Sequence, residues 1–131
     1  MGDRMRTSLS TLWIFATLNY LYCDLLGVMD PNMLKGHLSG HLGSITINQG
    51  FLLAAGALVE VPMLMVLVSR LVGFVPNRWA NVIAGAFMTV VQAASLFVST
   101  PTIYYVFFSV IEITATVAIV VIAWRWRPAA A

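Results

Sequence analysis

The sequence has few charged residues, and this scarcity limits the class of protein that it can encode. Asp, Glu, Lys and Arg make up 9% of the 131 residues, whereas soluble domains contain about 25%. The single cysteine, Cys23, excludes an internal disulfide framework. Basic residues are few and lie at the ends of apolar runs, so we expect no nucleic-acid partner. The chain also lacks a glycine-rich phosphate loop, a nucleophile elbow and a metal-ligand cluster, and we expect no cofactor.

Apolar residues are abundant instead, forming 60% of the chain and gathering in four long runs. We predict transmembrane helices at about 11–29, 48–70, 78–98 and 103–124. The last run has 22 residues. As a helix it spans roughly 33 Å, enough to cross a hydrocarbon core of about 30 Å. The predicted fold is all-α, a single integral membrane domain over residues 1–131 made of a four-helix transmembrane bundle.

Local signals mark where these helices begin and end. Asp30 and Pro31 have the order of an N-cap and a first-turn proline, so we predict a short interfacial helix at about 32–37, followed by a glycine-rich loop. Asn77 is the predicted N-cap of the third transmembrane helix. The segment 99–102 has the composition of a tight turn, so the third and fourth helices should form a hairpin.

The basic residues predict the orientation in the membrane. With the N-terminus inside, only Lys35 lies outside. The six basic residues on the cytoplasmic side are then Arg4, Arg6, Arg70, Arg78, Arg125 and Arg127. Trp79, Trp124 and Trp126 lie at the same boundary, where an aromatic belt is expected. We therefore predict that both termini are cytoplasmic.

Polar residues inside the apolar runs are the candidate functional residues. Asp24, Glu60 and Glu112 fall in the outer half or at the centre of the membrane when depth is counted at about 1.5 Å per residue. Glu112 shares one face of its helix with Tyr105, Ser109 and Thr116. This placement predicts a polar cavity that opens outward and is closed on the cytoplasmic side by apolar packing.

We expect these three acids to bind a proton, a cation or the polar head of a substrate. Their expected hydrogen-bond partners are Asn19, Gln92, Tyr104, Tyr105 and Ser109. No basic residue lies at their depth, so desolvation and like charge should keep them from all being ionised. Glu60 and Glu112 are expected on neighbouring helices, sharing one cavity. The alternative is structural, a protonated glutamate that only bonds neighbouring helices together.

Two further features carry open alternatives. Pro62 cannot donate to the carbonyl of Leu58, so it frees an acceptor close to Glu60, which fits either a binding site or helix packing. His37 and His41 have the H-x3-H spacing of metal ligands on a helix. Because glycines interrupt that segment, we favour two surface loop histidines over a metal site.

Several motifs resemble an uncharacterised family of small bacterial four-helix membrane proteins. They include Asn19-Tyr20-Leu21-Tyr22 with Asp24, Met29-Asp30-Pro31, Glu60-Val61-Pro62, Asn77-Arg78-Trp79-Ala80-Asn81 and Ile111-Glu112-Ile113. The resemblance covers nearly the whole chain and implies a bacterial inner-membrane protein without an established activity. The layout is also loosely similar to DoxX-like proteins and to the small multidrug resistance transporters, although the latter carry their acid in helix one.

The expected function is binding or proton-coupled transport of a small cationic or amphipathic ligand. One alternative is a membrane enzyme acting on a lipid-like substrate, with Glu60 or Glu112 as general acid or base. Another is an accessory subunit of a larger membrane complex. The expected partners are the lipid bilayer, the ligand or proton, and a second copy of the chain. Small residues between Gly85 and Ser95 offer a surface for such a homodimer.

Overall fold

The computed structural model describes residues 2–42, 45–98 and 100–127, and this part of the chain is mainly helical. Its elements are α1 (Gly2–Met29), α2 (Pro31–Ser39), β1 (His41–Leu42), β2 (Ile45–Thr46), α3 (Gln49–Leu71), α4 (Phe74–Ser95) and α5 (Ile103–Arg125). The two short strands pair in antiparallel fashion, His41 opposite Thr46 and Leu42 opposite Ile45. The all-α prediction is confirmed, and the strand pair occupies part of the predicted loop.

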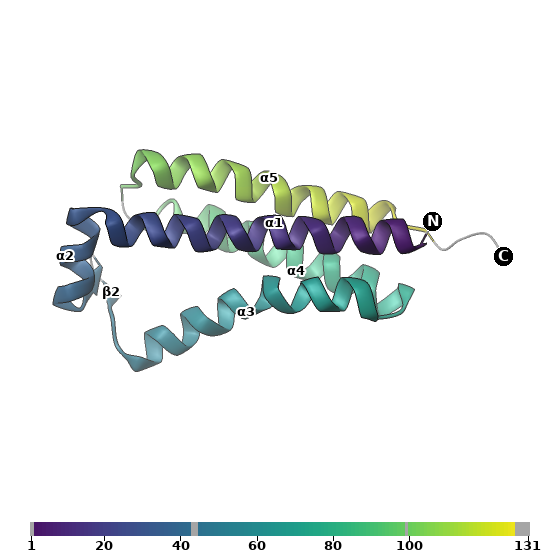
Figure 1. The fold of residues 1–131 in the computed structure, drawn as a ribbon, viewed down its shortest axis with the longest axis horizontal. Helices are drawn as coiled ribbons and strands as arrows, with labels where there is room; N and C mark the ends of the chain where they lie inside the picture. The colour runs from purple at the N-terminus through teal and green to yellow at the C-terminus, as the bar shows by residue number, and fades with distance from the viewer. Residues whose placement is uncertain (1, 43–44, 99, 128–131) are drawn as a thin grey trace.

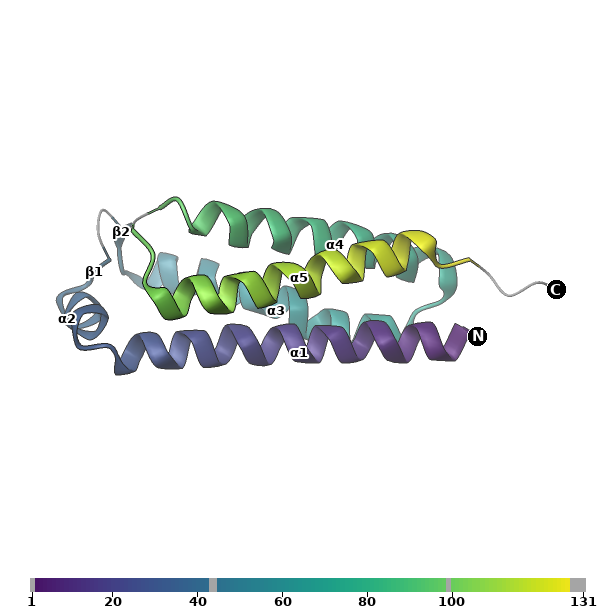
Figure 2. The same ribbon diagram turned by 90° about the horizontal axis from the view of Figure 1, so that it is seen from above.

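The four long helices form an antiparallel bundle (Figures 1 and 2). α1 packs against α3 and α5, and α4 packs against the same two helices. Each long helix therefore lies beside the helices that precede and follow it, as in an up-down-up-down bundle. α3 and α5 occupy opposite corners. This corrects the prediction that the helices of Glu60 and Glu112 are neighbours.

The bundle has two distinct ends, which we call the terminal end, where α1 begins and α5 ends, and the α2 end (Figure 1). The six arginines of the predicted cytoplasmic side belong to helix ends and flanking residues at the terminal end, whereas Lys35 is carried by α2. The predicted separation of charge is thus confirmed. That the terminal end faces the cytoplasm stays a prediction.

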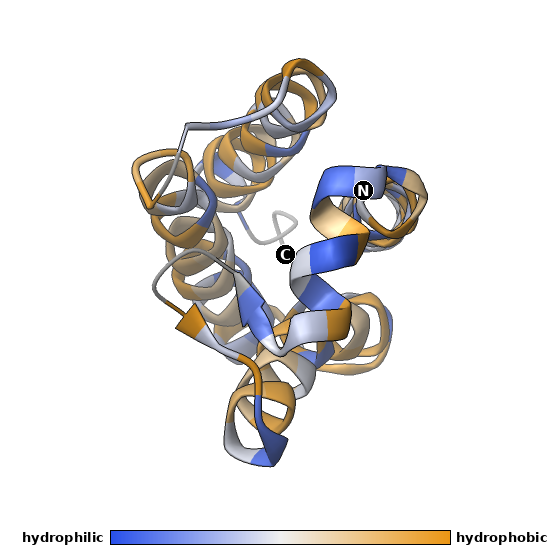
Figure 3. Ribbon diagram, turned by 90° about the vertical axis from the view of Figure 1, so that its left-hand side faces the viewer, coloured by the Kyte–Doolittle hydropathy of each residue, from blue (hydrophilic) through white to orange (hydrophobic). Residues whose placement is uncertain are grey.

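Within the described residues, three helices are long and apolar enough to cross a membrane, namely α1 over Asp3–Met29, α3 and α5. Figure 3 views the bundle along its axis from the α2 end and shows the long helices mostly in hydrophobic colours. Their length and composition suggest a membrane protein. α4 has 22 residues, and its crossing of the membrane stays a prediction.

Helix boundaries follow the capping signals at most junctions. The side chains of Asp30, Asn48 and Thr102 accept backbone N–H groups at the starts of α2, α3 and α5. α4 differs, because it begins at Phe74 after Gly73, so the prediction that Asn77 is its N-cap is wrong. Pro76 is tolerated there because the first turn of a helix needs no internal amide donor.

α3 is bent, and its first half diverges from α1 (Figure 1). Pro62 lies inside this helix and is buried. A proline there removes one backbone hydrogen bond and its ring crowds the preceding turn, which is the usual cause of a kink. As a result, much of the first half of α3 is exposed.

The terminal half of the bundle contains the main core. Leu9, Trp13 and Ile119 are fully buried there, together with Met65 and Trp126. Four fully buried polar side chains lie beside this apolar cluster: Ser10, Ser69, Asn77 and Asn81. The predicted apolar packing is thus present at this end, and it includes buried polar groups that the prediction left out. Asn77, read from the sequence as a cap, instead donates to the carbonyls of Ser69 and Val72 at the end of α3.

Candidate functional site

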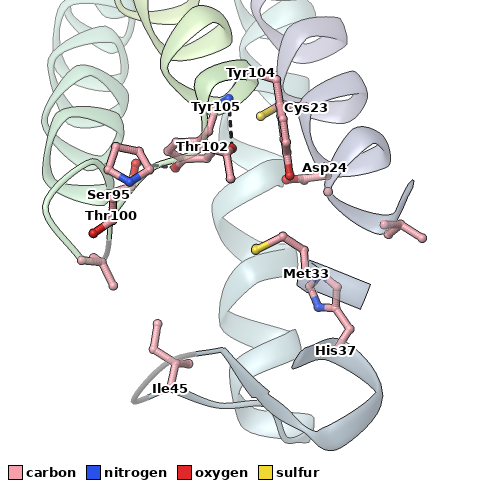
Figure 4. Close-up of a pocket in the computed structure, with 14 residues that line it drawn as sticks. Cys23, Asp24, Met33, His37, Ile45, Ser95, Thr100, Thr102, Tyr104 and Tyr105 are labelled. Atoms are coloured by element: carbon pink, nitrogen blue, oxygen red, sulfur yellow. Dashed lines mark hydrogen bonds between the residues drawn. The ribbon is translucent and has the colours of Figure 1, made fainter. Parts of the chain in front are cut away.

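A cavity of about 450 Å³ opens at the α2 end of the bundle (Figure 4). This volume falls within the range of roughly 300 to 1,000 Å³ that is typical of small-molecule sites. Part of the wall is apolar and comes from Gly27, Val28, Met33, Ile45, Val98 and Pro101. The polar groups on the wall are Cys23, Asp24, His37, Ser95, Thr100, Thr102, Tyr104 and Tyr105. The cavity thus combines a hydrophobic enclosure with one carboxyl group, one imidazole and two phenols.

Helix boundaries bring these groups together. The Asp30 carboxylate accepts the backbone N–H of Asn32 at 3.0 Å, so the chain leaves α1 and starts α2 across the end of the bundle. The hydroxyl of Tyr104 donates to the other oxygen of Asp30 at 3.1 Å and ties α5 to this corner. Thr102 accepts the N–H of Tyr105 and fixes the first turn of α5. The same residues that cap the helices therefore shape the cavity.

The cavity walls place the acidic and basic groups on different elements. Figure 4 shows Asp24 and Tyr104 on the side formed by α1 and α5, with Met33 and His37 projecting from α2. Tyr105 lies deeper, and its hydroxyl is 2.6 Å from the hydroxyl of Ser95 on α4. A carboxylate in apolar surroundings attracts a cationic group, and phenol rings can add cation–π contacts.

A second polar set lies inside the bundle, on the seam between α4 and α5. The Gln92 amide donates to the Ser109 hydroxyl at 2.7 Å, and Thr89 donates to Thr116 at the same distance. Glu112 lies between these two bridges on α5 and is 1% exposed. Neither of its carboxyl oxygens has a hydrogen-bond partner among the described residues. The predicted polar face of this helix is therefore confirmed as an internal one.

Two predicted site residues lie elsewhere. Glu60 is exposed on α3, so the structure does not bring it into a shared cavity with the buried Glu112. Asn19 donates to the carbonyl of Phe15 in its own helix at 2.8 Å. It borders a separate hollow of about 340 Å³ whose lining is mostly apolar. The single predicted cluster is thus divided into a cavity, a buried seam and two peripheral residues.

His37 lines the cavity, although the sequence interpretation gave it no role in the site; the short helix predicted at about 32–37, which contains it, is confirmed as α2. It belongs to α2 and is half-buried, rather than lying in a surface loop. His41 is exposed in β1, beyond Gly40, which ends α2 in the left-handed conformation with φ 81°. The H-x3-H spacing therefore does not put both imidazoles on one helical face. The position of His37 follows from Asp30 and Pro31, which predict the start of the helix that carries it, α2.

Comparison with known proteins supports a family assignment. The sequence model of DUF6326, a family of unknown function, matches residues 2–131. The chain belongs to this family. No curated protein matches the chain, and no solved structure does either. The resemblance to an uncharacterised family is confirmed at this level, whereas no relation of this DUF6326 chain to DoxX-like or small multidrug resistance proteins is shown.

Proposed function

We propose that this protein binds a small cationic or amphipathic ligand in the cavity at the α2 end and transports it in a proton-coupled manner. The observation that carries the proposal is the cavity itself, in which Asp24, Tyr104 and Tyr105 share an apolar enclosure of about 450 Å³. Its apolar wall suits the hydrophobic body of such a ligand, and Asp24 suits its cationic head. Among the described lining residues, His37 is the one basic group.

The proposed setting is a bacterial inner membrane that α4 crosses together with α1, α3 and α5. Ile83, Phe87 and Val90 of α4 are exposed and apolar, as a lipid-facing surface requires. The arginines at the terminal end favour a cytoplasmic location for that end under the positive-inside rule. In this orientation, the cavity opens on the outer side of the membrane.

Ligand binding can be tested with tetraphenylphosphonium, a lipophilic cation, on protein reconstituted in liposomes. We expect saturable binding to the wild-type protein and a roughly tenfold loss of affinity in Asp24→Asn, which corresponds to about 1.4 kcal/mol. Asp3→Asn is the matched control, because Asp3 is exposed in the first turn of α1, at the terminal end. Binding no greater than to empty liposomes, for this probe and for a panel of amphipathic amines, would contradict the proposal.

A membrane enzyme acting on a lipid-like substrate is the second candidate. In its favour, Asp24 and His37, two groups able to transfer protons, both line the largely hydrophobic cavity. Lipid extracts from cells with and without the protein, compared by mass spectrometry, separate the two candidates. A lipid modified only in the presence of the wild-type protein, and not of Asp24→Asn or His37→Gln, would favour the enzyme.

We further propose that the protein forms a homodimer through α3. Glu60 is exposed on this apolar helix, ten residues before Arg70. A carboxyl group facing lipid is costly, and a second copy that covers it removes the cost. The small residues between Gly85 and Ser95, the predicted dimer surface, are partly used within the chain, since Gly85 is buried against α5.

A further inference from the structure

Glu112 is the buried acid that the cavity does not explain. Glu112 is buried and lies on α5 between two α4–α5 bridges, Gln92 to Ser109 toward the α2 end and Thr89 to Thr116 toward the terminal end. The neighbouring hydroxyl of Thr116 donates to the backbone carbonyl of Glu112 at 3.1 Å, not to its side chain. Both carboxyl oxygens are thus left without a donor among the described residues.

The surroundings of Glu112 offer no positive charge within the described residues. The titratable groups close enough to act on it electrostatically are Tyr20, Cys23 and Asp24 on α1, and Tyr105 on its own helix. The residues facing it from α4, Gln92 and Thr89, do not titrate, and α3 lies at the opposite corner. An ionised carboxylate needs donors or a counter-charge when it is removed from water. This site provides neither to Glu112.

We propose that Glu112 is a proton-binding site that stays neutral at physiological pH and exchanges its proton with the cavity along the α4–α5 seam. A protonated carboxyl group can be buried here without a counter-charge, and its O–H can donate to a nearby carbonyl or hydroxyl oxygen. The buried hydroxyl of Tyr20, which also has no partner among the described residues, lies on α1, the other helix packed against α5.

The seam connects Glu112 to the cavity through a series of polar groups. Tyr105 and Ser95 line the cavity and share a hydrogen bond of 2.6 Å. Ser95 also bonds the carbonyl of Gln92 at 2.6 Å, and the Gln92 side chain reaches Ser109. Ser109 precedes Glu112 by three residues, about one helical turn. The hydroxyl groups of Tyr105, Ser95 and Ser109 along this series can each donate and accept a hydrogen bond.

This inference concerns the proton-coupling half of the proposed function, but it does not need a ligand to be correct. A proton held at Glu112 would be sensitive to a cation bound near Asp24, because Asp24 is close enough to act on Glu112 electrostatically. A cationic ligand could then favour release of that proton. The test below is made without ligand, so its failure would be distinguishable from a failure of ligand binding.

Infrared difference spectroscopy of the reconstituted protein can detect the C=O stretch of a protonated carboxyl group. We expect such a band at neutral pH in the wild-type protein, its loss in Glu112→Gln and its retention in Glu60→Gln. Glutamine has nearly the shape of a neutral glutamic acid, so the fold should persist. Labelling with carboxyl-13C glutamate provides a second readout, because it shifts glutamate bands without any substitution. The absence of a protonated glutamate band, its survival in Glu112→Gln, or its loss in Glu60→Gln would overturn the assignment.

The route is tested by the rate at which the same band shifts in D₂O. Tyr105→Phe removes the hydroxyl that bonds Ser95, and we expect it to slow the exchange several-fold. Tyr104→Phe is the matched control, because Tyr104 lines the same cavity but bonds Asp30 instead of the seam. Equal exchange rates in the two variants would overturn the proposed route.

Discussion

Asn81 connects three helices through a single side chain. Its Oδ1 accepts the indole N–H of Trp13 on α1 at 2.7 Å and the hydroxyl of Ser69 on α3 at 3.2 Å. Its Nδ2 donates to the side-chain oxygen of Asn77, also at 2.7 Å. All of these groups are fully buried. Removing the central amide therefore leaves several donors and acceptors without partners inside the bundle, where water cannot replace it.

We predict that Asn81→Leu lowers the free energy of unfolding by about 1–3 kcal/mol, the usual cost of leaving buried polar groups unpaired. Asn19→Leu is the matched control, because among the described residues the Asn19 side chain bonds only the carbonyl of Phe15, within α1. Its effect should stay within about 0.5 kcal/mol. Unfolding in mixed micelles with increasing dodecyl sulfate measures both. Similar losses in the two variants would mean that the Asn81 network contributes little.

Individual site residues were predictable where a single helix determined their position. The polar face of α5 follows from its own periodicity, and Ser109, Glu112 and Thr116 are indeed buried. The position of Glu60 could not be predicted in this way, because the face that α3 turns to its neighbours depends on how the whole helix packs. The prediction of Asn77 as an N-cap failed for a related reason. Asparagine serves both as an N-cap and as a buried hydrogen-bonding side chain, and the sequence does not distinguish the two. The carbonyls that accept from the Asn77 amide, those of Ser69 and Val72, lie at the end of another helix, α3.

The close approach of α4 and α5 depends on Gly85. A Cβ atom added at this position would lie 2.7 Å from Cγ2 of Val120 and 3.2 Å from the carbonyl oxygen of Thr116. The first neighbour is a side chain that could rotate, whereas the second is backbone and must shift with α5. Small residues at such a crossing let two helices pack with their backbones near each other.

Gly85→Ala should therefore destabilise the protein by about 1–3 kcal/mol, the range expected for overpacking a tight interface. Gly56→Ala provides the control, because a Cβ at Gly56 on α3 meets nothing within 4 Å. That change should be neutral, or stabilising by up to about 1 kcal/mol from helix propensity. Val120→Ala should restore only part of the loss, since the Thr116 carbonyl remains in place. Thermal unfolding in detergent would compare the variants, and equal melting temperatures for both alanine variants would contradict the packing argument.

Capping chemistry explains which elements could be predicted. Asp30 was predicted correctly as an N-cap, because a cap acts on amides only two or three residues away, and Asn48 and Thr102 cap α3 and α5 in the same way. The start of α1 at Gly2 was not predicted, because the prediction began the helix where the apolar run begins, at about residue 11. The polar segment before it contains no residue that stops a helix, so α1 continues through it. The β1–β2 pair was missed as well. Its bonds depend on two-residue strands that have no periodicity to detect.

The arrangement of α3, α4 and α5 follows from their short connections, which place consecutive helices side by side. This rule was available from the sequence, and it puts the second and fourth helices on a diagonal. The bend of α3 adds what no pattern specified, namely a first half that diverges from α1 (Figure 1). The exposed position of Glu60 follows from both features. The exposed Glu60 is the reason to expect a second copy of the chain against α3.

The homodimer proposal predicts contact between copies next to Glu60. In a Cys23→Ser background, Met63→Cys should form an intermolecular disulfide in membranes upon mild oxidation, because Met63 is exposed one turn from Glu60. Val110→Cys is the control, being similarly exposed on α5, the helix diagonally opposite. The detergent-corrected mass should be about twice the chain mass of 14.3 kDa. A mass near that of one chain, with no cross-link at Met63→Cys, would contradict the dimer and leave Glu60 facing lipid. Cross-linking that is equally efficient at both positions would indicate random collision instead of an interface through α3.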